Sequence, residues 1–169
     1  YREAYGIFAV NGILFNHESP LRGETFVTKK IISALCRIKQ NANEILYLGN
    51  IYAKRDWGHA LDYVKAMWLM LQQKKPDDYV VATGKQISVK KFIELVCKEL
   101  QIQIKWKGKG LNEIGYWKKK PIIKIDPKYF RPTEVDSLLG SSKKAKRILK
   151  WTPQYNIQKL VKEMIDYEL

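Results

Sequence analysis

An apolar run from Ile7 to Phe15 that ends abruptly in polar side chains constrains the fold more than any other feature. Its nearly continuous apolar character is typical of a strand buried on both faces of a parallel sheet. Four polar residues follow at once, and a proline and a glycine then favour a bend. In α/β proteins, the loop at the carboxyl end of such a strand carries ligand contacts. We therefore predict binding roles for Asn16, His17 and Arg22, with an ordinary connecting loop as the alternative.

Strand-like and helix-like segments alternate along the chain, which predicts an α/β fold. We expect helices at 1–5, 26–40, 57–71, 89–100, 143–149 and 157–165, and further strands at 44–48, 79–82, 102–106 and 122–125. Candidate caps precede four of the helices: Thr25, Asp56, Ser88 and Ser142. The helix after Asp56 has an apolar stripe, which we expect in the core: Trp57, Ala60, Leu61, Val64, Met67, Trp68 and Leu71. The segment from Lys107 to Lys120, rich in glycine and lysine, is expected to be a mobile loop.

The composition is that of a globular chain, with 169 residues, of which 46% are hydrophobic and 28% charged. This length is enough for one domain with its own core. No apolar run approaches the length of a membrane span, and the first residues lack the layout of a signal peptide. Cys36 and Cys97 lie in apolar helical patterns, as core thiols do in a reducing compartment. We therefore predict a cytoplasmic protein with no metal site and no membrane partner.

The formal net charge is +14, which favours either a polyanion or a small anionic ligand as partner. Polyanion binding needs a continuous basic stripe, usually with aromatic side chains between the charges. The lysines here are scattered in pairs and triples, such as Lys74-Lys75 and Lys143-Lys144. We interpret most of them as a solvated surface and predict no nucleic-acid partner.

Four charged residues have positions that suit a sugar nucleotide. A lysine in the first turn of a helix is disfavoured by the helix dipole, and an anion near Lys30 would offset this penalty. Arg55 and Arg131 lie on separate loops expected at the same side of a sheet, and guanidinium groups bind phosphate oxygens in pairs. The carboxylate of Glu134 suits sugar hydroxyls, because it can accept a hydrogen bond at each of its two oxygens. A solvated lysine and surface ion pairs are the alternatives.

Four stretches together resemble the GDP-mannose 4,6-dehydratase family of the extended short-chain dehydrogenase/reductase group. They are Asn-Gly-Ile-Leu-Phe-Asn-His-Glu-Ser-Pro-Leu-Arg-Gly (11–23), Phe-Val-Thr-Lys-Lys (26–30), Leu-Gly-Asn-Ile-Tyr-Ala-Lys-Arg-Asp-Trp-Gly-His-Ala (48–60) and Tyr-Phe-Arg-Pro-Thr-Glu-Val-Asp (129–136). The resemblance implies the last strands and helices of a Rossmann-type doubly wound sheet, plus a smaller α/β substrate-binding domain. It also implies a lyase that converts GDP-mannose to GDP-4-keto-6-deoxymannose, in the synthesis of fucose-type sugars, with NADP as cofactor.

The resemblance also implies roles for individual residues. His17 and Arg22 match the family's cofactor contacts. The matches to sugar-nucleotide contacts are Asn16, Val27, Lys30, Arg55, Arg131 and Glu134. The family usually has two arginines before the residue that is Gly23 here, whereas this chain has Leu21 followed by Arg22. We expect Arg22 alone to suffice for cofactor binding, with weaker binding as the alternative.

A complete enzyme of this group has a Gly-x-x-Gly-x-x-Gly turn that binds the cofactor and a catalytic Tyr-x-x-x-Lys pair. We identify neither in residues 1–169. No Gly-x-x-Gly-x-x-Gly spacing occurs among the ten glycines. The two Tyr-x-x-x-Lys matches, Tyr116–Lys120 and Tyr155–Lys159, are interpreted as chance. We therefore expect a single carboxyl-terminal portion, inactive alone, with its amino-terminal Rossmann half and catalytic residues upstream of residue 1. That half or a second copy is the expected protein partner. The alternatives are a non-catalytic sugar-nucleotide or anion-binding module and a basic nucleic-acid-binding domain.

Overall fold

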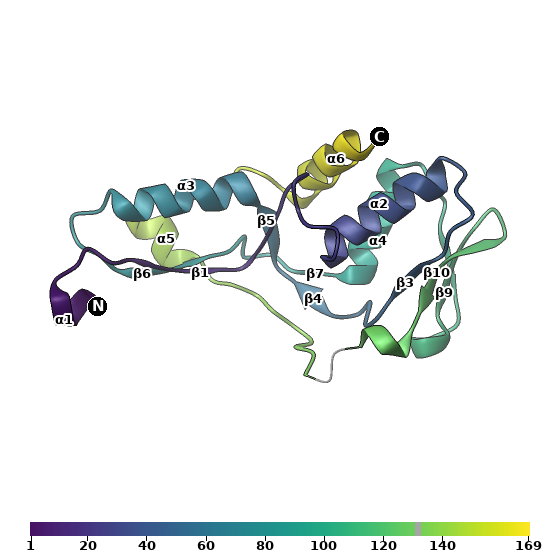
Figure 1. Cartoon of the computed structure of the whole chain (residues 1–169), viewed down its shortest axis with the longest axis horizontal. Helices are drawn as coiled ribbons and strands as arrows, with labels where there is room; N and C mark the ends of the chain where they lie inside the picture. The colour runs from purple at the N-terminus through teal and green to yellow at the C-terminus, as the bar shows by residue number, and fades with distance from the viewer. Residues whose placement is uncertain (131–132) are drawn as a thin grey trace. The chain divides into compact units, whose positions relative to one another are not determined.

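The computed structural model describes residues 1–130 and 133–169, which divide into two compact units. Unit 1 consists of Tyr1–Ser19, Asp56–Gln86 and Leu138–Leu160, and unit 2 consists of Pro20–Arg55, Ile87–Ser137 and Val161–Leu169. Each unit is therefore assembled from three segments that are far apart in the sequence (Figure 1). Within the described residues, no helix is both long enough and apolar enough to cross a bilayer.

Unit 1 combines short parallel strand pairs with helices. Its elements are α1 (Arg2–Tyr5), β1 (Asn11–Leu14), β2 (Asn16–Glu18), β5 (Trp57–His59), α3 (Ala60–Leu71), β6 (Asp78–Val81) and α5 (Lys143–Ile148). Strand β1 runs parallel to β6, and β2 runs parallel to β5 (Figure 1). Parallel strands connected through a helix confirm the α/β prediction.

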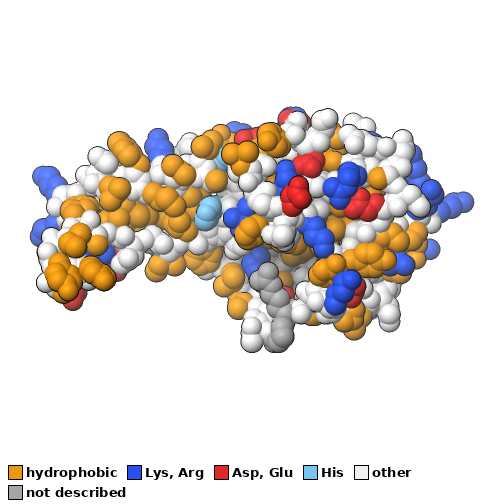
Figure 2. Space-filling view, in the orientation of Figure 1, with side chains coloured by type: hydrophobic (Ala, Val, Ile, Leu, Met, Phe, Trp, Pro, Cys, Tyr) orange, Lys and Arg blue, Asp and Glu red, His pale blue; other side chains and the backbone are white. Residues whose placement is uncertain are grey.

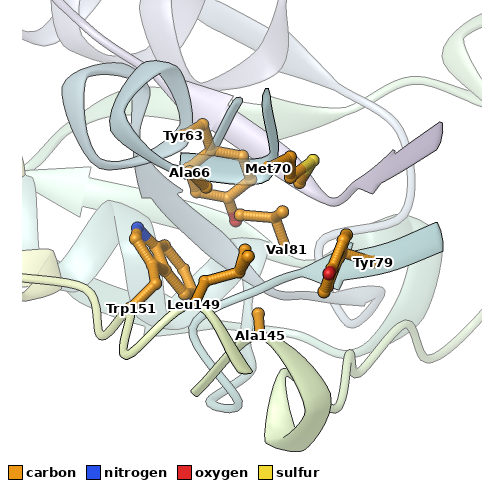
Figure 3. Close-up of a cluster of buried hydrophobic side chains, with 8 residues drawn as sticks. All are labelled: Tyr63, Ala66, Met70, Tyr79, Val81, Ala145, Leu149 and Trp151. Carbon is orange, nitrogen blue, oxygen red and sulfur yellow. The ribbon is translucent and has the colours of Figure 1, made fainter. Parts of the chain in front are cut away.

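The core of unit 1 is a cluster of buried side chains drawn from α3, β6 and the segment around α5. Figure 3 shows its members: Tyr63, Ala66, Met70, Tyr79, Val81, Ala145, Leu149 and Trp151. Trp151 closes the cluster at one end, and its Nε1 donates a hydrogen bond of 2.8 Å to the Asp62 carbonyl. The buried indole N–H is therefore satisfied, as a buried polar group must be.

The prediction of one strand buried on both faces at residues 7–15 was wrong. The segment forms two short strands, β1 and β2, separated at Phe15, whose N–H donates to the Val81 carbonyl. Ile13 remains 56% exposed, and Ile7 and Phe8 are also exposed. The physical reason is that β1 pairs with β6 along one edge, and its apolar outer face has no cover among the described residues.

The prediction for the helix after Asp56 was right in kind and wrong in its cap and its buried face. Residues 57–59 pair as β5, so α3 begins at Ala60. His59 is the cap, and its Nδ1 accepts a hydrogen bond of 3.1 Å from the Leu61 N–H. The predicted stripe is largely exposed at Leu61, Val64, Met67, Trp68 and Leu71. The helix is apolar on two faces, and the spacing alone could not tell which face the cluster of Figure 3 would bury.

Unit 2 is built on a mixed four-stranded sheet and two amphipathic helices. Its elements are α2 (Val27–Lys39), β3 (Leu46–Leu48), β4 (Lys54–Arg55), β7 (Ile87–Ser88), α4 (Val89–Glu99), β8 (Lys105–Lys107), η1 (Gly110–Asn112), β9 (Ile114–Trp117), β10 (Lys120–Ile125) and η2 (Pro127–Tyr129). The strand order is β3-β10-β9-β8, with β10 parallel to β3 and antiparallel to β9. Helix α6 (Ile157–Glu168) begins in unit 1 and ends in unit 2.

Helices α2 and α4 contact one another, and each has a mostly apolar buried face. Ser88 caps α4 as predicted, because its Oγ accepts a hydrogen bond of 3.1 Å from the Lys91 N–H. The cap predicted at Thr25 was wrong: Phe26 holds the cap position of α2 and makes no side-chain capping bond. The loop predicted from Lys107 to Lys120 was also wrong, since it contains η1 and β9.

Candidate functional site

Lys30 lies in the first turn of α2, where its ammonium group has two partners in unit 2. Nζ donates a hydrogen bond of 2.8 Å to the Tyr47 carbonyl and lies 4.1 Å from the centre of the Tyr129 ring. These contacts offset the unfavourable helix dipole that the sequence indicated. Val27, one turn earlier on the same helix, is half-buried. The ammonium is therefore held between β3 and the segment that follows β10.

A close backbone approach brings that segment against the end of β3. A Cβ at Gly49 would lie 2.4 Å from the Tyr129 carbonyl oxygen, so only glycine fits there. The Asp126 N–H also donates to the Leu48 carbonyl at 2.8 Å. A hollow of about 180 Å³ opens beside this contact, lined by Gly49, Asn50, Ile51, Tyr52, Gly110, Leu111, Ile125 and Phe130. It is smaller than the sites that hold whole drug-sized ligands, so it could take one ring of a larger molecule.

Arg55 and Glu134 meet at the edge of unit 2 although 79 positions separate them. Arg55 Nη2 donates to Glu134 Oε1 at 2.5 Å, and Nη1 donates to the Val135 carbonyl at 2.6 Å. Both side chains are mostly buried. The antiparallel pairing of β4 with β7 fixes Arg55 in this position, and a bridge from Lys54 to Ser137 ties in the segment that carries Glu134.

A buried carboxylate lies close to the hollow. Glu113 is 2% exposed, accepts a hydrogen bond of 2.6 Å from Lys90 Nζ and accepts another from the Tyr52 hydroxyl, which lines the hollow. Burial acts to raise the pKa of Glu113, but the bonds from Lys90 and Tyr52 outweigh it and leave the pKa lowered. The hydrogen bond between Tyr52 and Glu113 also raises the pKa of the Tyr52 hydroxyl. Sequence reasoning missed this trio because its members are far apart in the chain.

Asn16 and His17 lie on β2 in unit 1. His17 Nδ1 donates to the Phe15 carbonyl at 2.8 Å, and the imidazole stacks on Tyr63 with ring centres 4.9 Å apart. Burial raises the pKa of the Tyr63 hydroxyl. Gly58 stands opposite His17 in the ladder, and a Cβ there would lie 2.5 Å from Tyr63 Cε2. The imidazole is therefore held in one orientation, with Nε2 as the nitrogen that it can present to a ligand.

Asp56, which the sequence suggested as a helix cap, has a different role. Its buried carboxylate accepts hydrogen bonds from the Thr83 N–H at 2.9 Å, the Thr83 hydroxyl at 2.6 Å and the Gly84 N–H at 2.9 Å. A weaker contact of 3.4 Å comes from the Gly140 N–H. The carboxylate therefore joins three segments of unit 1 and is itself well satisfied.

The predicted site residues fall in both units. Unit 2 holds Arg22, Val27, Lys30, Arg55 and Glu134, and unit 1 holds Asn16 and His17. Of these, Arg55 and Glu134 are joined by an ion pair. The guanidinium of Arg22 lies 3.5 Å from the centre of the Phe26 ring. Arg131 lies outside the residues that the structure describes. Sequence reasoning missed Tyr47 and Tyr129, although the Gly49-Asn50 turn next to Tyr47 was a signal.

Comparison with known proteins gives the same family as the motifs. A family model described as GDP-mannose 4,6 dehydratase matches residues 1–164. The chain is 59% identical over 167 residues to the GDP-mannose 4,6 dehydratase of Dictyostelium discoideum, covering 98% of this chain and 47% of that protein. It is 56% identical over 169 residues to GDP-mannose 4,6 dehydratase 1 of Arabidopsis thaliana, covering 100% of this chain and 43% of that protein. The chain thus spans just under half the length of these relatives.

Solved structures share the fold at low sequence identity. The structure of RMD from Pseudomonas aeruginosa complexed with NADPH matches with a TM-score of 0.78 at 20% identity, over 99% of this chain and 50% of that one. The dTDP-glucose 4,6-dehydratase of Bacillus anthracis, in complex with NAD, matches with a TM-score of 0.76 at 16% identity, over 99% of this chain and 46% of that one. These matches confirm the α/β, Rossmann-type fold class, and the family match over nearly the whole sequence confirms the resemblance. This chain belongs to the GDP-mannose 4,6-dehydratase family.

Proposed function

We propose that these 169 residues supply the sugar-nucleotide-binding part of a GDP-mannose 4,6-dehydratase, the lyase that converts GDP-mannose to GDP-4-keto-6-deoxymannose. The observation that carries the proposal is the meeting of Arg55 with Glu134, at 2.5 Å, in the same unit as Lys30 and the hollow beside Gly49. A guanidinium suits the phosphates of a sugar nucleotide, a carboxylate can accept hydrogen bonds from sugar hydroxyls, and a ring-sized hollow can take one ring.

Each residue of the proposal has a role that follows from its chemistry. Arg55 binds diphosphate oxygens through its guanidinium, and Arg131 supplies the second cation. Glu134 accepts hydrogen bonds from the hydroxyls of a sugar. Lys30 and Val27 contact the nucleotide from α2, and Asn16 contacts the sugar nucleotide from unit 1.

A nicotinamide cofactor belongs to the same proposal. The related folds include structures solved with NADPH and with NAD, and we propose NADP for this chain. His17 fits a contact role, because its Nδ1 is bound to the Phe15 carbonyl and its Nε2 can face a ligand. Arg22 is the second proposed contact. Bound cofactor would accept and return a hydride, while the role of these two residues is to hold and orient it.

We propose that the 169-residue chain binds the sugar nucleotide without turning it over. Neither Tyr-x-x-x-Lys match has the geometry of a catalytic pair, in which one helical turn separates the two side chains. Tyr116 and Lys120 lie on the two strands of a hairpin. Tyr155 precedes the start of α6 and stacks on His59 with ring centres 3.9 Å apart. These placements support the interpretation of both matches as chance.

Calorimetric titration of the 169-residue chain tests the proposal. We expect GDP-mannose and GDP to bind with similar affinity, and mannose 1-phosphate to bind far more weakly, because the nucleotide and diphosphate make most of the proposed contacts. Lys30→Ala should weaken GDP binding, whereas Lys91→Ala, an exposed lysine on α4, should not. Failure of GDP-mannose and GDP to bind, or equal loss in both variants, would contradict the proposal.

We also propose that unit 1 buries its exposed apolar side chains against another protein surface. These side chains lie on β1 and α3: Ile13, Leu61, Val64, Met67, Trp68 and Leu71. Large apolar patches of this kind mark interaction surfaces. The partner is a second copy or the part of a complete enzyme that the match to the relatives leaves uncovered. Light scattering should show a concentration-dependent dimer, and Trp68→Glu should weaken it; a monomer at every concentration would exclude self-association.

A further inference from the structure

Unit 2 gathers lysines that are scattered in the sequence into one open hollow. The hollow has a volume of about 970 Å³ and is lined by Lys39, Gln101, Gln103, Lys105, Lys107, Tyr116, Trp117, Lys118 and Lys119. Five of its nine lining residues are lysines, and none is acidic. Figure 2 shows Lys and Arg side chains gathered over the region of the β9–β10 hairpin. We call this surface the lysine hollow.

The five lysines of the hollow have no carboxylate partner among the described residues, unlike several other lysines of unit 2. Elsewhere in the unit, Lys29, Lys90 and Lys128 each form an ion pair with a carboxylate. Among the described residues, no carboxylate pairs with any of the five lysines that line the hollow. Their charges therefore add to a local positive potential, which attracts polyanions.

Aromatic rings lie between these charges. Lys118 Nζ is 4.5 Å and Lys39 Nζ is 5.7 Å from the centre of a Trp117 ring, and Lys107 Nζ is 5.6 Å from the centre of the Tyr116 ring. Tyr116 is paired with Lys105 across the β8–β9 ladder, so both side chains emerge on the same face of the sheet. Trp117 follows Tyr116 directly on β9, so its ring emerges on the opposite face, and lysines lie beside an aromatic ring on each face. Cations beside aromatic rings are the combination used to bind single-stranded nucleic acid.

The turn that carries two of these lysines is unusual. Lys118 and Lys119 form the two-residue connection between β9 and β10, with φ values of 49° and 64°. Two successive positive φ values are the condition for a type I′ turn, where Asn-Gly is the favoured pair. Long side chains there strain the backbone, and proteins tend to break a local rule of this kind at functional sites.

Protection of a sheet edge is the plainer explanation, because β8 is an edge strand and lysines discourage pairing between edges. It accounts for Lys105 and Lys107 on β8. It does not account for the strained lysine pair in the turn, or for Lys39 at the end of α2. An acidic protein segment would satisfy the charges but would leave both aromatic rings without a partner of their own.

We propose that the lysine hollow binds single-stranded nucleic acid, with lysines on the phosphates and a base stacked on Trp117 or Tyr116. The ammonium groups that now lie over the rings move to phosphate oxygens, and a base takes their place on the ring. This inference reverses the sequence-based prediction of no nucleic-acid partner. It is independent of the proposed sugar-nucleotide site, which uses other residues of unit 2.

Fluorescence anisotropy with a short labelled oligothymidylate tests the proposal on the 169-residue chain. We expect binding at low salt, with a slope of log affinity against log salt of about −3.5 if all five lysines each neutralise one phosphate. The triple variant Lys105→Gln, Lys107→Gln and Lys118→Gln should lower the affinity at least about tenfold and reduce the slope by about 2.

The matched control removes the same charge elsewhere, through Lys65→Gln, Lys74→Gln and Lys75→Gln, three exposed lysines of unit 1. It should change the affinity by no more than about twofold, because none of these three lysines lines the hollow. Circular dichroism should show that both triple variants keep the fold. Equal losses in the two variants, or failure of the oligothymidylate to bind, would overturn the proposal.

Two competitors without bases separate nucleic acid from other polyanions. Inorganic polyphosphate and polyglutamate, matched in charge to the oligothymidylate, carry nothing that stacks on an aromatic ring. We expect both to displace the labelled probe less effectively than unlabelled oligothymidylate. Displacement as effective as that by the oligonucleotide, by either competitor, would overturn the assignment to nucleic acid.

Discussion

Arg55 Nη2 and Glu134 Oε1 lie 2.5 Å apart, in an ion pair that joins β4 to a segment 79 positions away. Both side chains are mostly buried, and each neutralises the charge of the other. Either charge buried alone would carry a large desolvation penalty. In the proposed function, a diphosphate competes with Glu134 for the guanidinium. The contribution of Arg55 to ligand affinity is therefore the free energy of its contact with the diphosphate minus that of its contact with Glu134.

Arg55→Ala should weaken GDP binding by about 1.5–3 kcal/mol, the usual contribution of hydrogen bonds to a charged group. Calorimetry measures this change directly. Arg37→Ala is the control, because Arg37 of α2 also pairs with a carboxylate, that of Glu44 at 2.8 Å, in a more exposed ion pair with no role in the proposed site. A similar loss of affinity in both variants would show that the effect is one of general charge rather than of a phosphate contact.

Gly49→Ala should weaken GDP binding without unfolding the chain. Its Cβ would lie 2.4 Å from the Tyr129 carbonyl oxygen, so the segment bearing Tyr129 and Phe130 must move away from the hollow. Gly23→Ala is the control, since its Cβ would meet the Phe26 ring at an ordinary 3.5 Å. Titration with GDP, together with thermal unfolding of both variants, checks the prediction. Unchanged affinity in Gly49→Ala would mean that this wall of the hollow does not contact the ligand.

Glu113 should make the stability of the chain depend on pH in the acid range. The pKa of Glu113 is lowered in the folded state, because the bonds from Lys90 and Tyr52 outweigh the opposing effect of burial. Its ionised form therefore stabilises the fold above the unfolded-state pKa of about 4.3. That contribution is lost as the pH falls through the lower folded-state value.

Urea unfolding at several pH values between neutrality and the acid range measures this effect. Glu113→Gln should have a lower free energy of unfolding near neutrality, and a shallower loss of it on acidification, than the unmodified chain. Glu24→Gln, which changes an exposed glutamate, should keep the full pH dependence. An identical pH profile for Glu113→Gln and the unmodified chain would contradict the assignment.

Cys36 and Cys97 should resist alkylation in the folded chain. Burial is the largest cause that raises the pKa of Cys36 to about 11 and that of Cys97 to about 12. A thiol with a pKa of about 11 is ionised in roughly one molecule in a thousand at pH 8, and the thiolate is the reactive form. Mass spectrometry after iodoacetamide treatment should show no modification without denaturant and two modified thiols in guanidinium chloride. Rapid labelling of the folded chain would show that a helix opens locally.

Elements with a single apolar stripe were predictable from the sequence. Helix α4 has its predicted cap at Ser88, and the apolar residues Phe92, Ile93 and Val96 form its buried face. The spacing determines the buried face when the opposite face is polar. Helix α3 was predictable as a helix and not in its orientation, because apolar side chains occupy two of its faces and only tertiary packing chooses between them.

The sequence supplies a set of candidate site residues, but it does not predict their contacts. The motifs pointed to Lys30, Arg55 and Glu134, but the partners of Lys30 are a carbonyl at Tyr47 and a ring at Tyr129, far from it in the chain. The association of Tyr52 with Glu113 is equally remote in sequence. Such contacts depend on register and on backbone approach, which no local pattern encodes.

The contact between Gly49 and Tyr129 joins segments that are synthesised at different times. Residues 49–52, which line the hollow, are synthesised about eighty residues before Phe130, which also lines it. Long-range closures of this kind are slow steps in folding. A nascent chain that has reached residue 110 therefore carries α2, β3 and α4 but not the complete hollow. If the proposed ligand binds there, it can assist only the last stage of folding.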